Sequence, residues 1–275
     1  FKIKNSDLKN MNTRPKKSLG QNFLNDQNVV NRIIKCADLS NEDVVLEIGP
    51  GKGILTEKIA KVCKKVVAIE IDERLVKILY DTLRNKENIE IVHDDVLKIN
   101  LPELVEKKLK TKSYKLVANI PHYITSQIIR LLLETKYPPK EMILMVQKEV
   151  AERIIAKPGN MSILAVSVQY YAKPEYLFTV PKVAFKPQPE VDSAVIRIVR
   201  NLESVNSDEE NVKKFFRIVR SGFSARRKTL ANNLSSSLKM DKREVEKKIE
   251  SLGFLKNIRA QELRIEDWKS LANVL

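Results

Sequence analysis

The four residues 119–122, Asn-Ile-Pro-His, place an amide and a flat ring directly after the run Tyr114-Lys115-Leu116-Val117-Ala118. This run predicts a buried strand. A strand that ends in these residues presents them at the carboxyl edge of a sheet, where open α/β sheets bind their ligands. We therefore expect a ligand site here, although His122 could instead be a structural residue that caps a helix.

A glycine-rich turn gives a second candidate site. Val44–Ile48 predicts a strand, and Gly49, Gly51 and Gly53 follow it before a helix. Such glycines let the backbone approach a ligand and leave amides free at the helix start, but a simple tight turn has the same composition. The next strand ends in Glu70, about twenty residues on, where a carboxylate can bind both hydroxyls of a ribose. The pair favours an adenosine-type cofactor.

The third strand ends at His93-Asp94-Asp95. Asp95 could accept a hydrogen bond from an adenine amino group, or the two aspartates could form a solvated turn. Three successive strands thus end in Glu70, Asp95 and Asn119. Polar groups at all three strand ends predict a cofactor site at one edge of the sheet.

The elements that must position these residues alternate between strand and helix, which predicts an α/β fold with a doubly wound, Rossmann-like sheet. A helix over 26–37 behind Asp26 precedes them. Residues 161–200 are β-rich and should add antiparallel strands at the far edge. The expected strands are Val44–Ile48, Val66–Ile71, Ile89–His93, Lys115–Ala118 and Glu141–Gln147, and the expected helices are 53–63, 73–85, 101–110 and 124–135.

The pattern along the chain predicts two domains. Residues 1–17 are basic and polar, and we expect them to be flexible. Residues 18–200 form the α/β domain, a polar acidic stretch around 201–211 is a linker, and 208–275 form a small all-helical domain.

The net charge of +15, from 50 Lys and Arg against 35 Asp and Glu, favours a polyanionic partner such as nucleic acid. A generally lysine-rich proteome is the alternative. Apolar runs fall well short of the ~20 residues that span a bilayer, so we expect no membrane association. Two cysteines outside any CxxC pair and two distant histidines predict no metal site and a reducing compartment. We expect a cytoplasmic protein, or an organellar one if a longer leader precedes residue 1.

Residues 119–122 resemble the Asn/Asp-apolar/Pro-Pro-aromatic motif of amino-group methyltransferases that use S-adenosylmethionine. The resemblance implies that Asn119 and the carbonyl of Ile120 or Pro121 accept hydrogen bonds from the target amino group. It also implies that His122, where the family usually has Tyr or Phe, stacks on the base. Tyr123 could partly substitute for it.

Further segments resemble the KsgA/RsmA-type rRNA adenine N6,N6-dimethyltransferases, from about residue 14 to the end. These enzymes dimethylate two adjacent adenines near the 3′ end of the small-subunit rRNA during ribosome biogenesis, and the resemblance implies a monomer that binds the small subunit. Phe185 would stack on the second face of the adenine. The matching segments are 18–26, 46–53, 185–195, 224–230 and 259–263, and the implied cofactor-binding residues are Asn22, Leu24, Gly49, Gly51, Glu70, Asp95 and Asn119.

Arg226, Arg227 and Lys228 should form a basic face on a helix, together with Arg217 and Arg220, that binds the RNA backbone. A solvated charge run is the alternative for such a triplet alone. Lys148, Arg153 and Lys157 would extend the basic surface.

Two rival functions share this fold. An Erm-type enzyme methylates one adenine of large-subunit rRNA, but its C-terminal domain usually lacks the Arg-Arg-Lys-Thr-Leu stretch found here at 226–230. A non-catalytic ribosome-assembly factor or mitochondrial transcription factor is the other rival, and His122 in place of the usual aromatic residue is the feature that supports it.

Overall fold

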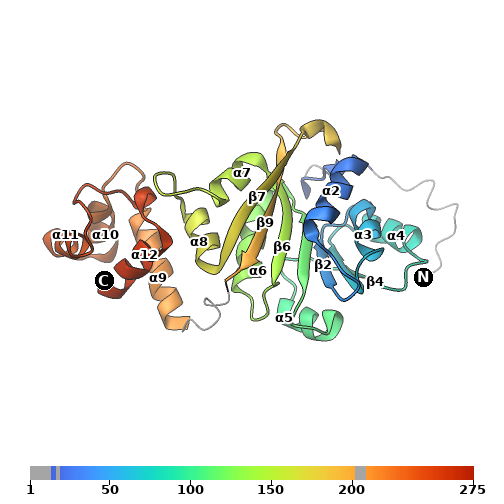
Figure 1. Ribbon diagram of the computed structural model, residues 1–275, viewed down its shortest axis with the longest axis horizontal. Coiled ribbons are helices and arrows are strands. Elements are labelled where there is room, and N and C mark those ends of the chain that lie inside the picture. Colours follow the sequence, from blue (N-terminus) through green and yellow to red (C-terminus); the bar gives the residue numbers. More distant parts are fainter. Residues whose placement is uncertain (1–13, 17–18, 202–208) are drawn as a thin grey trace. The chain divides into compact units, whose positions relative to one another are not determined.

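The computed structural model describes residues 14–16, 19–201 and 209–275 (Figure 1). Most of the segment 1–17 that was predicted to be flexible, and most of the predicted linker, lie outside the described residues. The chain divides into two compact units, one made of residues 1–151 and 175–200 and the other of residues 152–174 and 201–275. This division differs from the predicted one, because residues 152–174 belong to the helical unit rather than to the α/β domain.

The first unit is built on a seven-stranded sheet in the order β4-β3-β2-β5-β6-β9-β7. The five strands from β4 to β6 are parallel, and β9 pairs antiparallel with β6. The predicted α/β architecture and the antiparallel far edge are confirmed. The strands are β2 (Val44–Ile48), β3 (Lys65–Glu70), β4 (Ile89–His93), β5 (Lys115–Asn119), β6 (Glu141–Gln147), β7 (Ala172–Val180) and β9 (Ser193–Arg200).

The helices that connect these strands follow the predicted order. Asp26 caps the first of them by accepting hydrogen bonds from the backbone amides of Asn28 and Val29, as expected of an N-cap aspartate. The predicted helix 101–110 begins as the α-helix α5 (Leu101–Leu104) and continues as the π-helix η2 (Val105–Leu109). The other helices are α2 (Gln27–Ala37), α3 (Ile54–Ala60), α4 (Glu73–Thr82), α6 (Thr125–Glu134) and α7 (Lys148–Ile154).

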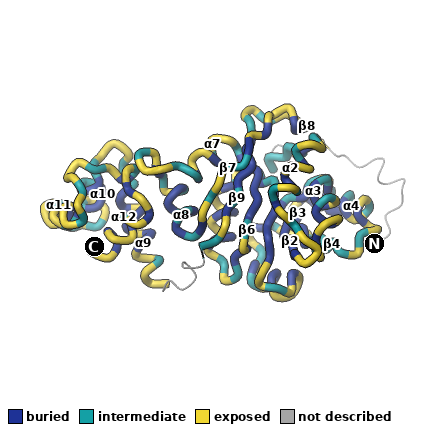
Figure 2. Tube along the Cα trace, in the orientation of Figure 1, coloured by how far each residue is buried: buried dark blue, intermediate teal, exposed yellow. Residues whose placement is uncertain are grey.

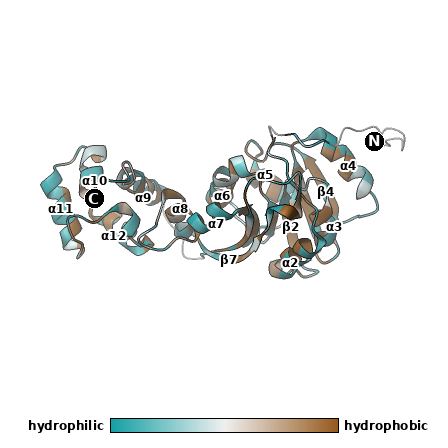
Figure 3. Cartoon of the chain, turned by 90° about the horizontal axis from the view of Figure 1, so that it is seen from above, coloured by the Kyte–Doolittle hydropathy of each residue, from teal (hydrophilic) through white to brown (hydrophobic). Residues whose placement is uncertain are grey.

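A continuous core joins α2 and α3 to one face of the sheet. Val30 and Ile33 of α2 and Ile59 of α3 pack with Val45 and Val117 of the central strands, and each is at most 2% exposed. Burying a side chain of this size contributes roughly 1.5–3 kcal/mol. Figures 2 and 3 show buried, hydrophobic segments along the strands and exposed, polar ones on the outer helices. Because this core fixes how the strands pack, it also sets where each strand ends and where the strand-end residues lie.

A second, two-stranded sheet joins parts of the chain that are far apart in sequence. β1 (Phe23–Leu24) pairs antiparallel with β8 (Phe185–Lys186), and Leu24 lies opposite Phe185. The backbone amide of Asn25 also donates to the carbonyl of Ala184, at 2.8 Å. This pairing holds the 18–26 segment beside the 185–195 segment.

The second unit is helical, and its first helix was predicted to be β-structure. Residues 163–171 form α8 because Ser162 caps the helix through the amide of Ala165, at 3.2 Å. The helix is apolar on most sides, and Tyr170 packs against Phe215 with ring centroids 4.4 Å apart. The β-branched composition that favoured a strand is thus accommodated by burial in a helical core. The other helices of this unit are α9 (Glu209–Gly222), α10 (Leu230–Leu238), α11 (Lys242–Ser251) and α12 (Ile265–Val274).

The basic triplet Arg226, Arg227 and Lys228 was also predicted to be helical, and it is not. α9 ends at Gly222, and Thr229 caps α10 by accepting from the amide of Asn232. The triplet therefore lies in the turn between the two helices. Across the described residues, no helix is both long enough and apolar enough to cross a membrane.

Candidate functional site

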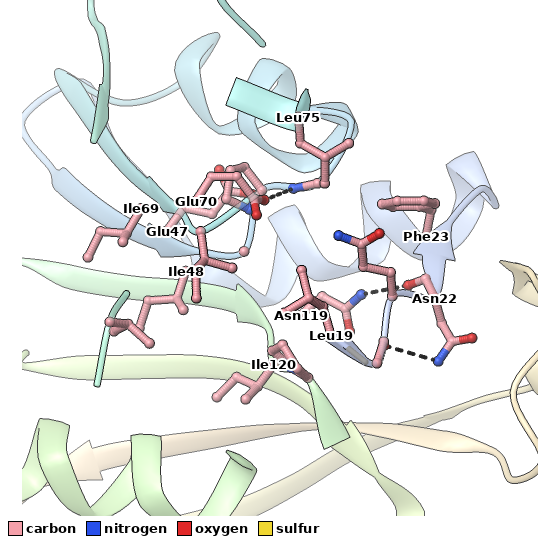
Figure 4. Close-up of a pocket in the computed structure, with 18 of the residues that line it drawn as sticks. Leu19, Asn22, Phe23, Glu47, Ile48, Ile69, Glu70, Leu75, Asn119 and Ile120 are labelled. Carbon is pink, nitrogen blue, oxygen red and sulfur yellow. Dashed lines mark hydrogen bonds between the residues drawn. The ribbon is translucent and has the colours of Figure 1, made fainter. Parts of the chain in front are cut away.

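A cavity of about 220 Å³ opens at the carboxyl edge of the sheet in the first unit (Figure 4). Its walls come from the ends of β2, β3 and β5, from the loop after β4, and from the 19–24 and 185 segments that the small sheet joins. Every catalytic and cofactor-binding residue predicted from the sequence lines this one cavity. These residues are Asn22, Leu24, Gly49, Gly51, Glu70, Asp95, Asn119, Ile120, Pro121, His122 and Phe185.

The glycine turn after β2 has a shape that side chains would disrupt. Gly51 has a φ of +60°, and a Cβ there would lie 3.1 Å from the ring of Phe23. Gly53 has a φ of +80°, and its Cβ would meet Leu79 at 2.9 Å. Left-handed backbone and close neighbours together favour glycine at both positions. The turn can therefore approach a ligand closely.

Glu70 ends β3 as a buried carboxylate that the backbone orients. Its Oε2 accepts from the amide of Gly51 at 3.2 Å, and its Oε1 accepts from the amide of Asp72 at 2.9 Å. Burial raises the pKa of Glu70, while these two amides act in the opposite direction. Each carboxylate oxygen can accept a further hydrogen bond, so a ligand hydroxyl can be received here.

Glu47 of β2 also lines the cavity and is not among the residues predicted from the sequence. The residue is 1% exposed, and no described residue provides a hydrogen bond to its Oε2. Burial, together with the nearby Glu70, raises its pKa to about 8. A carboxyl group within the otherwise apolar strand Val-Val-Leu-Glu-Ile was the available sequence signal. Besides the carboxylate of Glu70, the cavity thus holds a carboxyl group that is protonated at neutral pH.

Asn119 at the end of β5 has one end of its amide fixed and the other free. Its Nδ2 donates to the carbonyl of Asn22 at 3.4 Å (Figure 4), and in this orientation Oδ1 remains an available acceptor. Asn22 is itself held by a bond from its Nδ2 to the carbonyl of Gly20, at 3.3 Å. The edge of the sheet therefore presents an oriented amide oxygen to the cavity.

The two carbonyl groups that follow Asn119 differ in the hydrogen bonds that they accept. The Pro121 carbonyl accepts from the amide of Ile124 at 3.3 Å and from Thr125 Oγ1 at 3.2 Å. Among the described residues, no hydrogen bond reaches the carbonyl of Ile120, whose own amide is bound to Met145 at 3.1 Å. Of the two carbonyls that the sequence left open, Ile120 is the one with free acceptor capacity.

Two rings line the cavity near this acceptor pair. His122 lies in the 3₁₀ turn η3 (His122–Ile124) and is half-buried, and burial lowers its pKa. Its ring is therefore uncharged at neutral pH. Phe185 is 5% exposed and is fixed by its pairing with Leu24. Tyr123 also lines the cavity, but it is 56% exposed.

Asp95 lies in the loop after β4. Its Oδ1 accepts from the amide of Leu97 at 3.0 Å, and its Oδ2 lies 3.7 Å from Lys98 Nζ. The carboxylate is thus oriented rather than loosely solvated, and it retains acceptor capacity toward the cavity.

The predicted RNA-binding residues lie in the second unit. Arg226, Arg227 and Lys228 are all exposed in the turn before α10, and Arg217 and Arg220 are exposed on α9. The cavity and the basic turn are therefore separate features of the two units. In the part of the chain that the structure describes, no group of three or more His, Cys, Asp or Glu residues has an arrangement that could hold a metal ion.

Comparisons with known proteins agree on one family. The model of the family described as ribosomal RNA adenine dimethylase matches residues 12–275. The ribosomal RNA small subunit methyltransferase A of Geobacillus kaustophilus is 47% identical, covering 94% of this chain and 90% of the relative. The protein of the same name from Dehalococcoides mccartyi is 41% identical, covering 94% and 87%.

Two solved structures are similar over most of their length. The 23S rRNA methyltransferase ErmE superposes with a TM-score of 0.73 and 30% identity, covering 92% of this chain and 99% of that one. A dimethyladenosine transferase from Plasmodium falciparum gives a TM-score of 0.76 and 27% identity, covering 90% and 95%. With its fold and the match over nearly its whole length, the chain belongs to the ribosomal RNA adenine dimethylase family.

Proposed function

We propose that this protein is a small-subunit rRNA adenine N6,N6-dimethyltransferase that uses S-adenosylmethionine and acts on two adjacent adenines near the 3′ end of that RNA. The observation that carries the proposal is the pair of free acceptors, Asn119 Oδ1 and the Ile120 carbonyl, at the edge of a cavity that also contains Glu70. Family membership and relatives named small subunit methyltransferase A support it.

The cavity has a donor and acceptor set that fits the cofactor. Glu70 offers oriented carboxylate oxygens for ribose hydroxyls, and Asp95 offers one for an adenine amino group. Gly49, Gly51 and Asn22 would line the methionine part, with Leu24 packing along it. Bound there, S-adenosylmethionine supplies an activated methyl group carried on a sulfonium.

The residues of the chain would act by holding the target amino group rather than by acid–base chemistry. Asn119 Oδ1 and the Ile120 carbonyl would accept hydrogen bonds from this amino group, which orients the nitrogen lone pair. The adenine must leave its stack to reach them. His122 and Phe185 would then cover its two faces, and a neutral imidazole avoids placing a positive charge beside a cationic methyl donor.

Binding to the RNA backbone would come largely from the helical unit. Arg226, Arg227 and Lys228 are exposed in a turn, where all three can reach phosphates. Lys148, Arg153 and Lys157 would add to the basic surface. We propose that the partner is the small ribosomal subunit and that the protein acts in the cytoplasm as a monomer, without a metal.

The test is methyl transfer from labelled cofactor to immature small subunits and to protein-free large-subunit rRNA. We expect label only in the small subunit. Label only in large-subunit rRNA would favour an Erm-type enzyme, although ErmE at 30% identity is more distant than the relatives at 41–47%. Normal binding to small subunits without transfer would favour the non-catalytic assembly factor.

A further inference from the structure

Asp72, two residues after Glu70, is a buried carboxylate that the cavity chemistry does not use. Its side chain is fully buried and accepts from Arg74 Nη2 at 2.6 Å and from Arg74 Nε at 3.0 Å. It also accepts from Gln21 Nε2 at 2.9 Å and from Lys16 Nζ at 3.3 Å. The bonds from Arg74, Gln21 and Lys16 hold the pKa of Asp72 well below its usual range. Asp72 is therefore ionised, and its carboxylate binds groups from two parts of the chain.

One part is the N-terminal segment formed by the described residues 14–16 and 19–22, which we call the strap. Within it, Gln21 Oε1 accepts from the amide of Lys16 at 2.7 Å, so the Gln21 side chain bridges the strap and Asp72. Arg74 Nη1 also donates to the carbonyl of Arg14, at 3.3 Å. The strap is thus tied to the start of α4 by side chains, and four of its residues line the cavity: Leu19, Gly20, Gln21 and Asn22.

The strap is also tied to the opposite side of the cavity. The carbonyl of Asn22 accepts from Asn119 Nδ2, the bond that leaves Asn119 Oδ1 free (Figure 4). On the other side, the amide of Asp72 fixes Oε1 of Glu70. One set of hydrogen bonds therefore runs from Glu70 through Asp72 and the strap to Asn119.

We propose that the Asp72 side chain is a positioning group that fastens the strap along the cofactor cavity, so that cofactor retention and the orientation of Asn119 both depend on it. The proposal rests on the proposed function for the identity of the cofactor. Asp72 does not line the cavity, so its carboxylate acts through Gln21 and Lys16 of the strap rather than by touching a ligand.

The test uses the full chain and the substitution Asp72→Asn, which keeps the shape of the side chain but removes its charge. Hydrogen–deuterium exchange of residues 19–24 reports on the strap without any ligand. Calorimetric titration with S-adenosylmethionine and S-adenosylhomocysteine reports on the cofactor. We expect faster exchange and a Kd that rises roughly 10- to 100-fold for both ligands, as for loss of hydrogen bonds to a charged group. The KM for cofactor should rise more than kcat falls.

Two further variants separate positioning from general damage. Gln21→Leu removes both bonds of the Gln21 side chain, to Asp72 and to the Lys16 amide, and leaves the Arg74 contacts of Asp72 in place, so it should reproduce the faster exchange. Asp43→Asn removes a different buried aspartate, bound to Lys140 at 2.9 Å, and should lower stability without changing exchange of 19–24 or either Kd. An unchanged Kd or exchange rate in Asp72→Asn, or equal changes in Asp43→Asn, would overturn the proposal. Failure of the unmodified protein to bind either ligand would instead contradict the proposed function, and the exchange comparison would still test the strap.

Discussion

Asp43 and Glu47 lie four residues apart, at the amino and carboxyl edges of the same part of the sheet, and their surroundings differ. Asp43 accepts from Lys140 at 2.9 Å and from Ser40, and lies 3.4 Å from Lys115 Nζ. Burial alone would raise its pKa, but these partners lower it to about 2. Glu47 has an unpaired oxygen, and burial raises its pKa to about 8. The carboxyl group at the amino edge has its hydrogen-bond partners within the protein, whereas the one at the carboxyl edge can still bind a ligand.

The same contrast holds for asparagines. Asn88, just before β4, donates to the carbonyls of Ala60 and Cys63 at 2.8 and 3.1 Å and so joins parts of the fold. Asn119, at the end of β5, is fixed by one bond and leaves its oxygen free. Polar groups at the amino edge therefore stabilise the structure, and those at the carboxyl edge are available for chemistry.

The largest expected effect comes from Asn119→Ala. Loss of one of two acceptors for the amino group should lower kcat for methyl transfer by roughly 100- to 1000-fold, the range seen when a single stabilising group is removed from an active site. The comparison variant Asn88→Ala should lower the free energy of unfolding by about 1–2 kcal/mol and leave kcat near normal. Radiolabel transfer and thermal unfolding measure the two effects. A similar kcat for both variants would contradict the functional difference between the amino and carboxyl edges of the sheet.

Glu47→Gln should change how stability depends on pH. The pKa of Glu47 is raised in the folded protein, so its contribution is complete below about pH 4.5 and is lost as the pH rises toward 8. The variant should lack this loss of stability. The loss is on the order of 3 kcal/mol, because one pKa unit corresponds to about 1.4 kcal/mol and part of the shift in the pKa of Glu47 depends on Glu70. Urea unfolding at pH 5 and pH 8 measures it. Parallel pH curves for the two proteins would show that Glu47 is not held protonated.

Asp43→Asn should show the opposite dependence. The stabilisation by Asp43 is present above its ordinary pKa of 3.8 and is lost as the pH falls through about 2. The variant should be less stable at pH 7 by about 2 kcal/mol, and this difference should disappear in acid. Urea unfolding between pH 2 and 7 tests the expectation, and a difference that persists at pH 2 would argue for a packing effect instead.

The smallest effect concerns His122. Because burial lowers its pKa, the ring should stay neutral until the pH falls below the ordinary histidine range. We expect activity to decline several-fold only in that acidic region, and His122→Phe should abolish this decline while keeping a stacking ring. The pH–rate profile from 5 to 8 tests it. A decline that persists in the variant would assign the titration to another group.

Much of the fold and the ligand edge could be predicted because strand ends in a parallel sheet converge on one edge. Glu70, Asp95 and Asn119 were selected for this reason, and all three line one cavity. The pairing of Leu24 with Phe185 joins segments about 160 residues apart, and no periodicity within either segment encodes it.

The errors have equally local causes. Residues 163–171 have a strand-like composition, but their conformation is decided by the Ser162 cap and an aromatic core supplied by α9. The basic triplet at 226–228 suits a helix by composition, yet it lies between the end of α9 at Gly222 and the cap at Thr229. Glu47 and Asp72 were missed because their importance depends on burial and on partners, which only the folded chain reveals.

The most direct test of adenine dimethylation at Asn119 is the nucleoside composition of small-subunit rRNA after reaction with the protein and with Asn119→Ala at saturating cofactor. Nuclease digestion and mass spectrometry should find N6,N6-dimethyladenosine at two adjacent positions with the unmodified protein and almost none with the variant. Dimethyladenosine formed at a normal rate by Asn119→Ala, or methyl groups found on other nucleotides, would contradict it.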